Sequence, residues 1–297
     1  MTNIEWCKNP PGCMKSGEVW EVTSGCSPVS EGCAGCFAAR LVGTRLKHHP
    51  DYEGLARFSE VDRCSRYAWT GEVRLLAHNL EKPLHWRTPR MVFVNSKSDL
   101  FHPSVPADYI TRVYETMSAC PQHEFFVCTK RPERIVPVLY GEEGGWYLGG
   151  GDYIPNVIHL TSVENQAAAD ERIPELLKLK DECSAWRIGI SAEPLIGPVW
   201  IKGPGCWACF GRGHNPALSE LFCPVCCDLD FVIVGAESGP NARPCDPAWI
   251  ADIVAQCQAA GVAVFVRHPL GGKADWPEEL GIRQWPKMRK INGEADQ

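Results

Sequence analysis

The chain has 297 residues, enough for one large barrel-type domain or two ordinary ones, and this length can bury a core without disulfides. Hydrophobic residues make up 44% and charged residues 22%, as in globular proteins, and no apolar run is long enough to cross a bilayer. The net charge of −6 argues against a protein that coats a nucleic-acid backbone, but it leaves a nucleotide-sized substrate open.

Short apolar segments alternate with helix-like segments along the chain. We expect strands at residues 19–23, 90–95, 124–129, 156–162, 186–191, 230–235 and 262–266. Helices are expected at residues 36–46, 106–119, from 132 onward, at 165–179 and at 246–260, whereas the polar residues 48–67 predict irregular structure. This alternation predicts an α/β fold with a mostly parallel sheet, arranged as a partial or closed (β/α) barrel in one domain over residues 1–297.

Polar side chains follow most of the predicted strands. Helix capping accounts for part of this pattern, because Ser, Asp and Asn are the usual cap residues. Capping does not explain a glutamate after each of three strands, namely Glu164, Glu193 and Glu237. Because functional residues of a barrel collect at the carboxyl ends of its strands, the pattern favours a polar ligand pocket there.

The first cysteine cluster places Cys26, Cys33 and Cys36 within eleven residues, between a predicted strand and a predicted helix. Three cysteines that bind a 4Fe–4S cluster leave one iron without a protein ligand, and this iron can chelate the amino and carboxylate groups of S-adenosylmethionine (SAM). The alternative is a zinc site, which normally takes four ligands and would need Cys7 or Cys13 as the fourth. The pattern favours the iron–sulfur cluster and leaves zinc open.

The second cysteine cluster lies in residues 203–228, an expected insertion between two strands. Two C-x2-C pairs can each give two thiolates to one tetrahedral metal, which is a strong zinc-ribbon signal. The expected Zn²⁺ ligands are Cys206, Cys209, Cys223 and Cys226. Four cysteines also permit an auxiliary iron–sulfur cluster, and we favour zinc.

Six segments resemble, in the same order, a phage-associated family often called the three-Cys-motif family and considered radical SAM-like. They are WEVTSGCSPVSEGCAGCFAAR, VFVNSKSDLFHPSVP, CTKRPER, HLTSVENQ, ISAEPLIGP and IVGAESGPNARPCDPAW, and together they cover roughly residues 17–267. The resemblance implies a radical SAM barrel with Cys26, Cys33 and Cys36 as the 4Fe–4S ligands. The C-x6-C-x2-C spacing departs from the C-x3-C-x2-C of most radical SAM enzymes.

The same resemblance implies that groups at the strand ends contact SAM or the substrate. Ser96, Ser98 and Asp99 follow the strand at which the superfamily usually recognises the SAM amino group, and a carboxylate or hydroxyl can accept a hydrogen bond from that ammonium. Glu193 and Glu237 are further cofactor-binding candidates. The candidate catalytic residues are Glu164, Glu193 and Lys130. Lys130 and Arg131 would hold the SAM carboxylate or a substrate phosphate, or they simply begin a solvated helix.

The sequence therefore predicts a cytoplasmic radical SAM enzyme that abstracts hydrogen from a nucleotide or a modified DNA base. The residues most suited to gripping a nucleotide, Trp69, His85, Trp86, Arg87 and Arg90, suit core packing equally well, and we prefer core packing for the two tryptophans. Family analogy suggests rearrangement of an amino-acid-decorated thymidine in phage DNA hypermodification, with electrons from a flavodoxin- or ferredoxin-type donor and no membrane partner. The alternatives are a non-enzymatic, zinc-stabilised protein that binds nucleic acid or a partner, and an electron-transfer iron–sulfur protein.

Overall fold

The structure is a computed structural model that describes residues 4–7, 16–58, 67–141, 152–201, 228–239, 242–267 and 277–286. Seven strands form one parallel sheet, in the spatial order in which they follow along the chain. They are β1 (Ser16–Trp20), β6 (Arg90–Val94), β7 (Glu124–Thr129), β8 (Val157–Ser162), β9 (Arg187–Ala192), β10 (Phe231–Val234) and β11 (Ala263–Val266). This sequential order is that of a half-barrel, so the predicted α/β partial barrel is confirmed.

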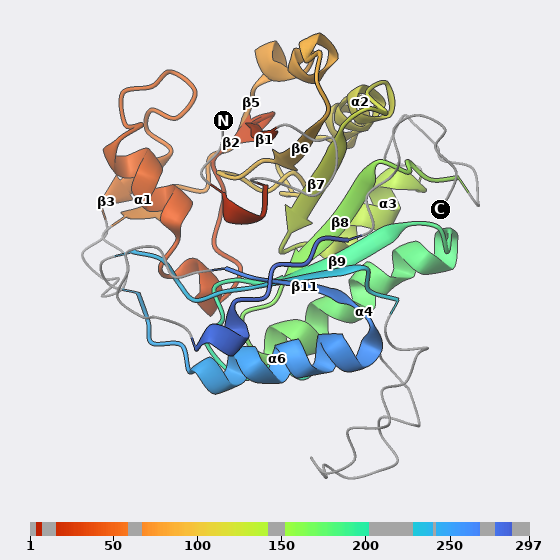
Figure 1. Ribbon diagram of the computed structural model, residues 1–297. Helices are drawn as coiled ribbons and strands as arrows, with labels where there is room; N and C mark the ends of the chain where they lie inside the picture. The colour runs from red at the N-terminus through yellow and green to blue at the C-terminus, as the bar shows by residue number, and fades with distance from the viewer. Residues whose placement is uncertain are drawn as a thin grey trace.

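The helices are α1 (Phe37–Thr44), α2 (Ala107–Ser118), α3 (Ile135–Leu139), α4 (Gln166–Glu182) and α6 (Pro247–Ala260). Figure 1 shows α4 and α6 along one face of the sheet, while α1 and β3 lie beyond the ends of the central strands, on the left of the view. Short 3₁₀ turns are η1 (Glu5–Cys7), η2 (Glu31–Cys33), η3 (Ala77–Asn79), η4 (Lys82–His85), η5 (Pro132–Arg134) and η7 (Glu278–Leu280). The helix predicted from residue 132 thus begins as the 3₁₀ turn η5 and continues as α3.

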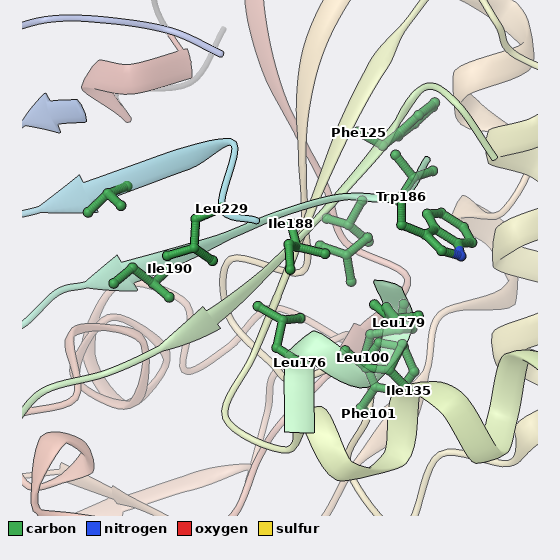
Figure 2. Packing of buried hydrophobic residues seen from close by; sticks show 14 of the residues in the cluster. Leu100, Phe101, Phe125, Ile135, Leu176, Leu179, Trp186, Ile188, Ile190 and Leu229 are labelled. Atoms are coloured by element: carbon green, nitrogen blue, oxygen red, sulfur yellow. The ribbon is translucent and has the colours of Figure 1, made fainter. Parts of the chain in front are cut away.

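Successive side chains of each strand point to opposite faces of the sheet, and this alternation produces two separate apolar layers. In β7, Phe125 and Val127 belong to the large core under the helices, whereas Phe126 belongs to a second cluster on the other face. In the large core, Ile188 and Ile190 of β9 pack near Leu176 of α4 (Figure 2). Burial of these side chains is the main term that holds the helices to the sheet.

The second cluster fills the concave face of the half-barrel. Trp6 of η1 packs edge-on against Phe93 and Phe126, with ring centroids 5.1 Å apart in both pairs. Trp285 packs on Phe265 and donates a hydrogen bond from its indole nitrogen to the Trp6 carbonyl, at 2.9 Å. Residues from near both ends of the chain therefore form an apolar floor, and polar side chains follow further along the same strands.

Two predictions about the amino-terminal part were wrong. The first strand is β1, Ser16–Trp20, instead of residues 19–23, because the amides of Val22 and Thr23 leave the ladder and donate to Oδ1 of Asn95, at 2.8 and 3.2 Å. Thr23–Ser24 instead form β2, which pairs with β5 (Arg74–Leu75). The polar region predicted to be irregular, residues 48–67, contains β3 (Ala56–Phe58), which pairs antiparallel with β4 (Tyr67–Trp69) at the end of that region.

Core packing of the two tryptophans is confirmed in part. Trp69 is buried in a small cluster with Ala39, Val42 and Leu55, and Trp86 is half-buried against the large core. Among the helices that the structure describes, none is long and apolar enough to cross a membrane.

Candidate functional site

The three cysteines of the first cluster lie on the chain between β2 and α1. Cys26 follows Gly25, whose φ of 87° favours glycine and whose backbone forms a bridge with Ser98 in the segment after β6. Cys33 ends the turn η2, and Cys36 is the N-cap of α1, where its sulfur accepts the Ala39 amide at 3.5 Å. The loop is thus anchored at both ends, by the sheet and by a helix.

Burial and neighbouring charges act on two of the three thiols, those of Cys26 and Cys36. Burial raises the pKa of Cys26 to about 12, with a further rise from Asp99 and a smaller one from Cys36, against which Arg131 acts. Burial also raises the pKa of Cys36, and Cys33 adds to this rise. Cys26 and Cys36 also pack against the same small apolar cluster. Thiols in such a place ionise at neutral pH only if a cation or a metal compensates the charge.

Asp99 and Arg131 form a buried ion pair beside Cys26. Nη1 of Arg131 lies 2.8 Å from Oδ2 of Asp99 and 3.9 Å from the Cys26 sulfur. The Asp99 carboxylate also accepts hydrogen bonds from the Thr129 hydroxyl and from the amides of Phe101 and Lys130, at 2.7, 3.0 and 3.2 Å. A carboxylate has about four acceptor positions, so these four donors occupy Asp99 fully.

Glu164 lies at the end of β8, in contact with the cysteine loop. Its side chain is 1% exposed and accepts hydrogen bonds from Lys130 at 3.0 Å and from Arg172 at 2.9 Å. Burial alone would raise the pKa of Glu164, but Lys130, Ser30 and Arg172 outweigh it and lower the pKa to about 2. A Cβ on Gly32 would come within 2.9 Å of the Glu164 carboxyl carbon, so the loop packs directly on this group.

Glu237 contacts the same loop from the end of β10. Its carboxylate accepts hydrogen bonds from the amide, Nε and Nη2 of Arg243, at 2.8, 2.9 and 2.7 Å. Burial raises the pKa of Glu237, and the three bonds from Arg243 outweigh this effect and lower it. Nη1 of Arg243 donates to the Glu31 carbonyl at 2.9 Å, and a Cβ on Gly35 would overlap the Glu237 carboxylate. Glu164 and Glu237 therefore fix the loop on either side of Cys33.

The other predicted site residues have partners of their own. Glu193, beside a cis peptide bond to Pro194, pairs with Arg267 at the end of β11. The hydroxyl of Ser96 donates to Glu21 at 2.5 Å, and that of Ser98 donates to the Thr23 carbonyl at 2.9 Å. The structure thus brings Asp99, Lys130 and Glu164 into one network with the cysteine loop, whereas the described contacts of Ser96 and Glu193 lie outside that network.

Two arginines of the site were not predicted. Arg172 and Arg243 fix the two glutamates that contact the loop. Arg172 follows Glu164 by eight residues, and Arg243 follows Glu237 by six. Thr129 connects Asp99 to Arg131, since its hydroxyl donates to Asp99 and accepts the Arg131 amide at 2.9 Å. An arginine six or eight residues after a strand-end acid is a signal that could have identified these two arginines.

The remaining cysteines are distributed as follows. Cys7 is buried in the apolar floor, apart from the cluster that contains Cys26 and Cys36, so it is not the fourth ligand that a zinc site would need. Cys120 and Cys257 are buried in the large core, where they pack as small apolar side chains. The predicted zinc ligands lie outside the described residues, as does Cys13, and that zinc site stays a prediction. The ligands in question are Cys206, Cys209, Cys223 and Cys226.

The donor set at the first cluster fits an iron–sulfur cluster held by three cysteines. The thiols are free, and amide donors point at two of the sulfurs, from Val29 to Cys33 at 3.4 Å and from Ala39 to Cys36. Hydrogen bonds to sulfur are a usual feature of such clusters. Within the described part of the chain, no three Cys, His, Asp or Glu side chains converge where a single metal ion could be held. A 4Fe–4S cluster needs a wider arrangement, because each cysteine binds a different iron.

Comparison with protein families assigns the chain. A family model described as a protein of unknown function (DUF5131) matches residues 1–287. The chain belongs to this family. No curated protein matches the chain.

Two solved structures show a slight likeness to this DUF5131 chain. One is a point mutant of spore photoproduct lyase, with 14% identity over 84% of this chain and 61% of that chain, at a TM-score of 0.36. The other is a double mutant of spore photoproduct lyase with bound AdoMet and dinucleoside spore photoproduct. It is 13% identical over 85% of this chain and 62% of that chain, also at a TM-score of 0.36. The chain spans about three fifths of the length of these two structures.

Proposed function

We propose that the protein is a radical SAM enzyme whose 4Fe–4S cluster is held by Cys26, Cys33 and Cys36. The observation that supports this function is the fixation of the three-cysteine loop by charged groups at the carboxyl ends of parallel strands. Asp99 follows β6, Arg131 follows β7, Glu164 follows β8 and Glu237 follows β10, and each contacts the loop or a group bound to it. Three thiols held this rigidly suit a cofactor whose geometry must not change between turnovers.

Such a cluster, with SAM on its open iron, supplies a 5′-deoxyadenosyl radical after one-electron reduction. The chain's own residues then have two tasks. Glu164 and Glu237 keep the loop in place through their contacts with Gly32 and Gly35. Lys130 is the cation for the SAM carboxylate, because the described contacts use one of its three donors, on Glu164, and its side chain is 18% exposed.

Other strand-end groups have assigned roles in this proposal. Glu193 and its partner Arg267 bind polar groups of SAM or of the substrate. Ser96 and Ser98 act on the cofactor indirectly, because their hydrogen bonds fix the chain segment that faces it. Asp99 acts through Arg131 instead of contacting the SAM ammonium, because its acceptor positions are occupied.

The substrate in this proposal is a nucleotide or a modified DNA base, and the specific reaction is rearrangement of an amino-acid-decorated thymidine in phage DNA. This step rests on the motif resemblance alone. The proposed setting is the cytoplasm, with a flavodoxin- or ferredoxin-type donor, and the cysteine knuckle at 203–228 holds Zn²⁺. A non-enzymatic zinc protein that binds nucleic acid or a partner is the alternative that the experiment must exclude.

The test is anaerobic reconstitution of the full chain with iron and sulfide, followed by metal analysis and addition of dithionite and SAM. We expect about four irons per chain and formation of 5′-deoxyadenosine. Cys33→Ala should abolish both, whereas Cys183→Ala, which changes another half-buried thiol at the end of α4, should leave both unchanged. Zinc uptake without iron and without SAM cleavage would remove the proposed function and leave the zinc-stabilised binding protein.

A further inference from the structure

Arg131 is a buried cation directed at one of the three cysteines. Its side chain is 8% exposed, and its guanidinium lies between the Asp99 carboxylate and the Cys26 sulfur, with Nη1 2.8 Å from the first and 3.9 Å from the second. Nη2 donates to the carbonyl and the hydroxyl of Ser27, both at 3.0 Å. The guanidinium is therefore held on two sides, and its position beside Cys26 is fixed.

These contacts leave Arg131 with a different role from that of Lys130. Its Nη1 and Nη2 atoms serve four acceptors, Asp99, Cys26 and the two oxygens of Ser27, all within the protein. An arginine that binds a ligand carboxylate through a two-pronged contact needs both of these nitrogens. The geometry therefore directs the charge of Arg131 at Cys26 instead of at a ligand.

His102 lies in the same network without a charge of its own. Its Nδ1 accepts the Ser104 amide at 3.1 Å, so the proton of the neutral ring belongs on Nε2, which lies 2.8 Å from the Ser27 hydroxyl. Burial, followed by the nearby charge of Arg131, lowers the pKa of His102 and favours this neutral form. The cation beside Cys26 in this network is thus Arg131.

The other two cysteines receive neutral donors. The Val29 amide donates to Cys33 at 3.4 Å and the Ala39 amide donates to Cys36 at 3.5 Å. Cys26 differs because its donor is a cationic side chain, the Arg131 guanidinium, at 3.9 Å. Reduction potentials of iron–sulfur clusters depend on the net charge around them and on hydrogen bonds to their sulfurs. A cation at one ligand favours the reduced cluster, which carries one more negative charge.

We infer that Arg131, fixed by Asp99 and Ser27, is a positioning residue that raises the reduction potential of the cluster at Cys26. This inference rests on the proposed function. The electron comes from an external one-electron donor, and Arg131 itself neither gains nor loses an electron or a proton. Its charge makes the reduced state easier to reach for a donor of moderate potential.

The experiment is a redox titration of the reconstituted full chain, followed by the electron paramagnetic resonance signal of the reduced cluster. We expect the midpoint potential of Arg131→Gln to be more negative than that of the unaltered protein. Arg131→Lys keeps the charge and should fall between the two. Arg112→Gln makes the same change of charge on an exposed residue of α2, and its potential should equal that of the unaltered protein.

A second variant guards against misfolding, because Arg131→Gln leaves the buried Asp99 carboxylate without its cation. Asp99→Asn/Arg131→Gln removes both charges and the hydrogen bond from Arg131 to Cys26. Because Asp99 acts on Cys26 against Arg131, the midpoint potential of this double variant should lie between those of Arg131→Gln and the unaltered protein. Equal potentials in all these variants, with the cluster assembled, would overturn the inference while the proposed function stands. If the unaltered protein takes up no iron, the proposed function fails and the inference fails with it.

Discussion

The carboxylate of Glu237 lies directly against the α-carbon of Gly35. A Cβ at residue 35 would be 2.6 Å from the Glu237 carboxyl carbon, much closer than non-bonded carbons approach. The Glu237 carboxylate cannot easily move away from residue 35, because three hydrogen bonds from Arg243 fix both of its oxygens. The contact therefore makes the position of the loop between Cys33 and Cys36 depend on a residue two hundred positions away in the chain.

Gly35→Ala should displace this loop and lower the cluster content. We expect the variant to fold and to retain little of the iron that the unaltered chain takes up in reconstitution, because a shifted Cys33 or Cys36 no longer meets its iron. Iron and sulfide per chain are the measurement. Gly197→Ala is the matched control, since its Cβ would make only an ordinary contact, 3.5 Å from the Cβ of Asn165. Full iron content in Gly35→Ala would show that the contact does not fix the loop.

Glu164 should give the protein a pH-dependent part of its stability. Its pKa in the folded state is about 2, compared with an ordinary 4.5, so the unfolded chain takes up the proton first as the pH falls. The stabilisation is therefore complete above pH 4.5 and is lost as the pH falls towards 2. Urea unfolding at several pH values should show this loss in the unaltered protein and a flatter profile in Glu164→Gln.

At neutral pH, Glu164→Gln should lower the free energy of unfolding by about 3 kcal/mol, because Lys130 and Arg172 are left without their buried counter-charge. Glu175→Gln is the matched control. It breaks an ion pair with Lys178, whose side chain is 54% exposed, and such surface pairs contribute about 0–1 kcal/mol. A pH profile of Glu164→Gln that matches the unaltered one would rule out this linkage.

The fold followed from patterns that are local in the sequence. Each strand from β6 to β11 is a short apolar run, and the sequence placed them within one or two residues of their observed bounds. The first strand was misplaced because its end depends on Asn95, more than seventy residues away, whose side chain takes the amides of Val22 and Thr23. Likewise, β3 and β4 pack on α1 where the ring of Tyr67 lies against Gly43, a contact that no local pattern indicates.

The sequence indicated which strand-end acids lie near the cysteine loop, but it did not indicate the hydrogen-bond partners of those acids. Acids at the ends of parallel strands must meet at one edge, so the position of Glu164 and Glu237 near the cysteines follows from topology. An acid can accept a hydrogen bond from a ligand only if donors within the protein leave one of its acceptor positions open. The acceptor positions of Asp99 are all occupied, by Arg131 and three neutral donors. The sequence could not distinguish these cases, because side-chain partners are set by distances that only the folded chain defines.

The apolar floor should be a major source of stability. Trp6 is 4% exposed and packs against Phe93 and Phe126, so Trp6→Ala should lower the free energy of unfolding by about 3–5 kcal/mol. Chemical unfolding followed by circular dichroism measures this change. Trp200→Ala removes an indole that is 49% exposed and should cost little. Equal effects of the two substitutions would mean that η1 does not close the half-barrel.

Substitution of Lys130 should separate the binding of SAM from the assembly of the proposed cluster. Its ammonium uses one donor on Glu164 in the described contacts, and Arg172 still neutralises Glu164 when Lys130 is replaced. Lys130→Gln should therefore assemble the cluster normally but bind SAM about ten-fold more weakly or worse, since a hydrogen bond to a charged group contributes about 1.5–3 kcal/mol. Equilibrium binding of SAM to the reconstituted variant, beside an iron count, checks both parts. Lys178→Gln, on the exposed side of α4, should bind SAM as the unaltered protein does. If Lys130→Gln also binds SAM unchanged, Lys130 does not contact the cofactor, and its charge serves only to hold Glu164 against the cysteine loop.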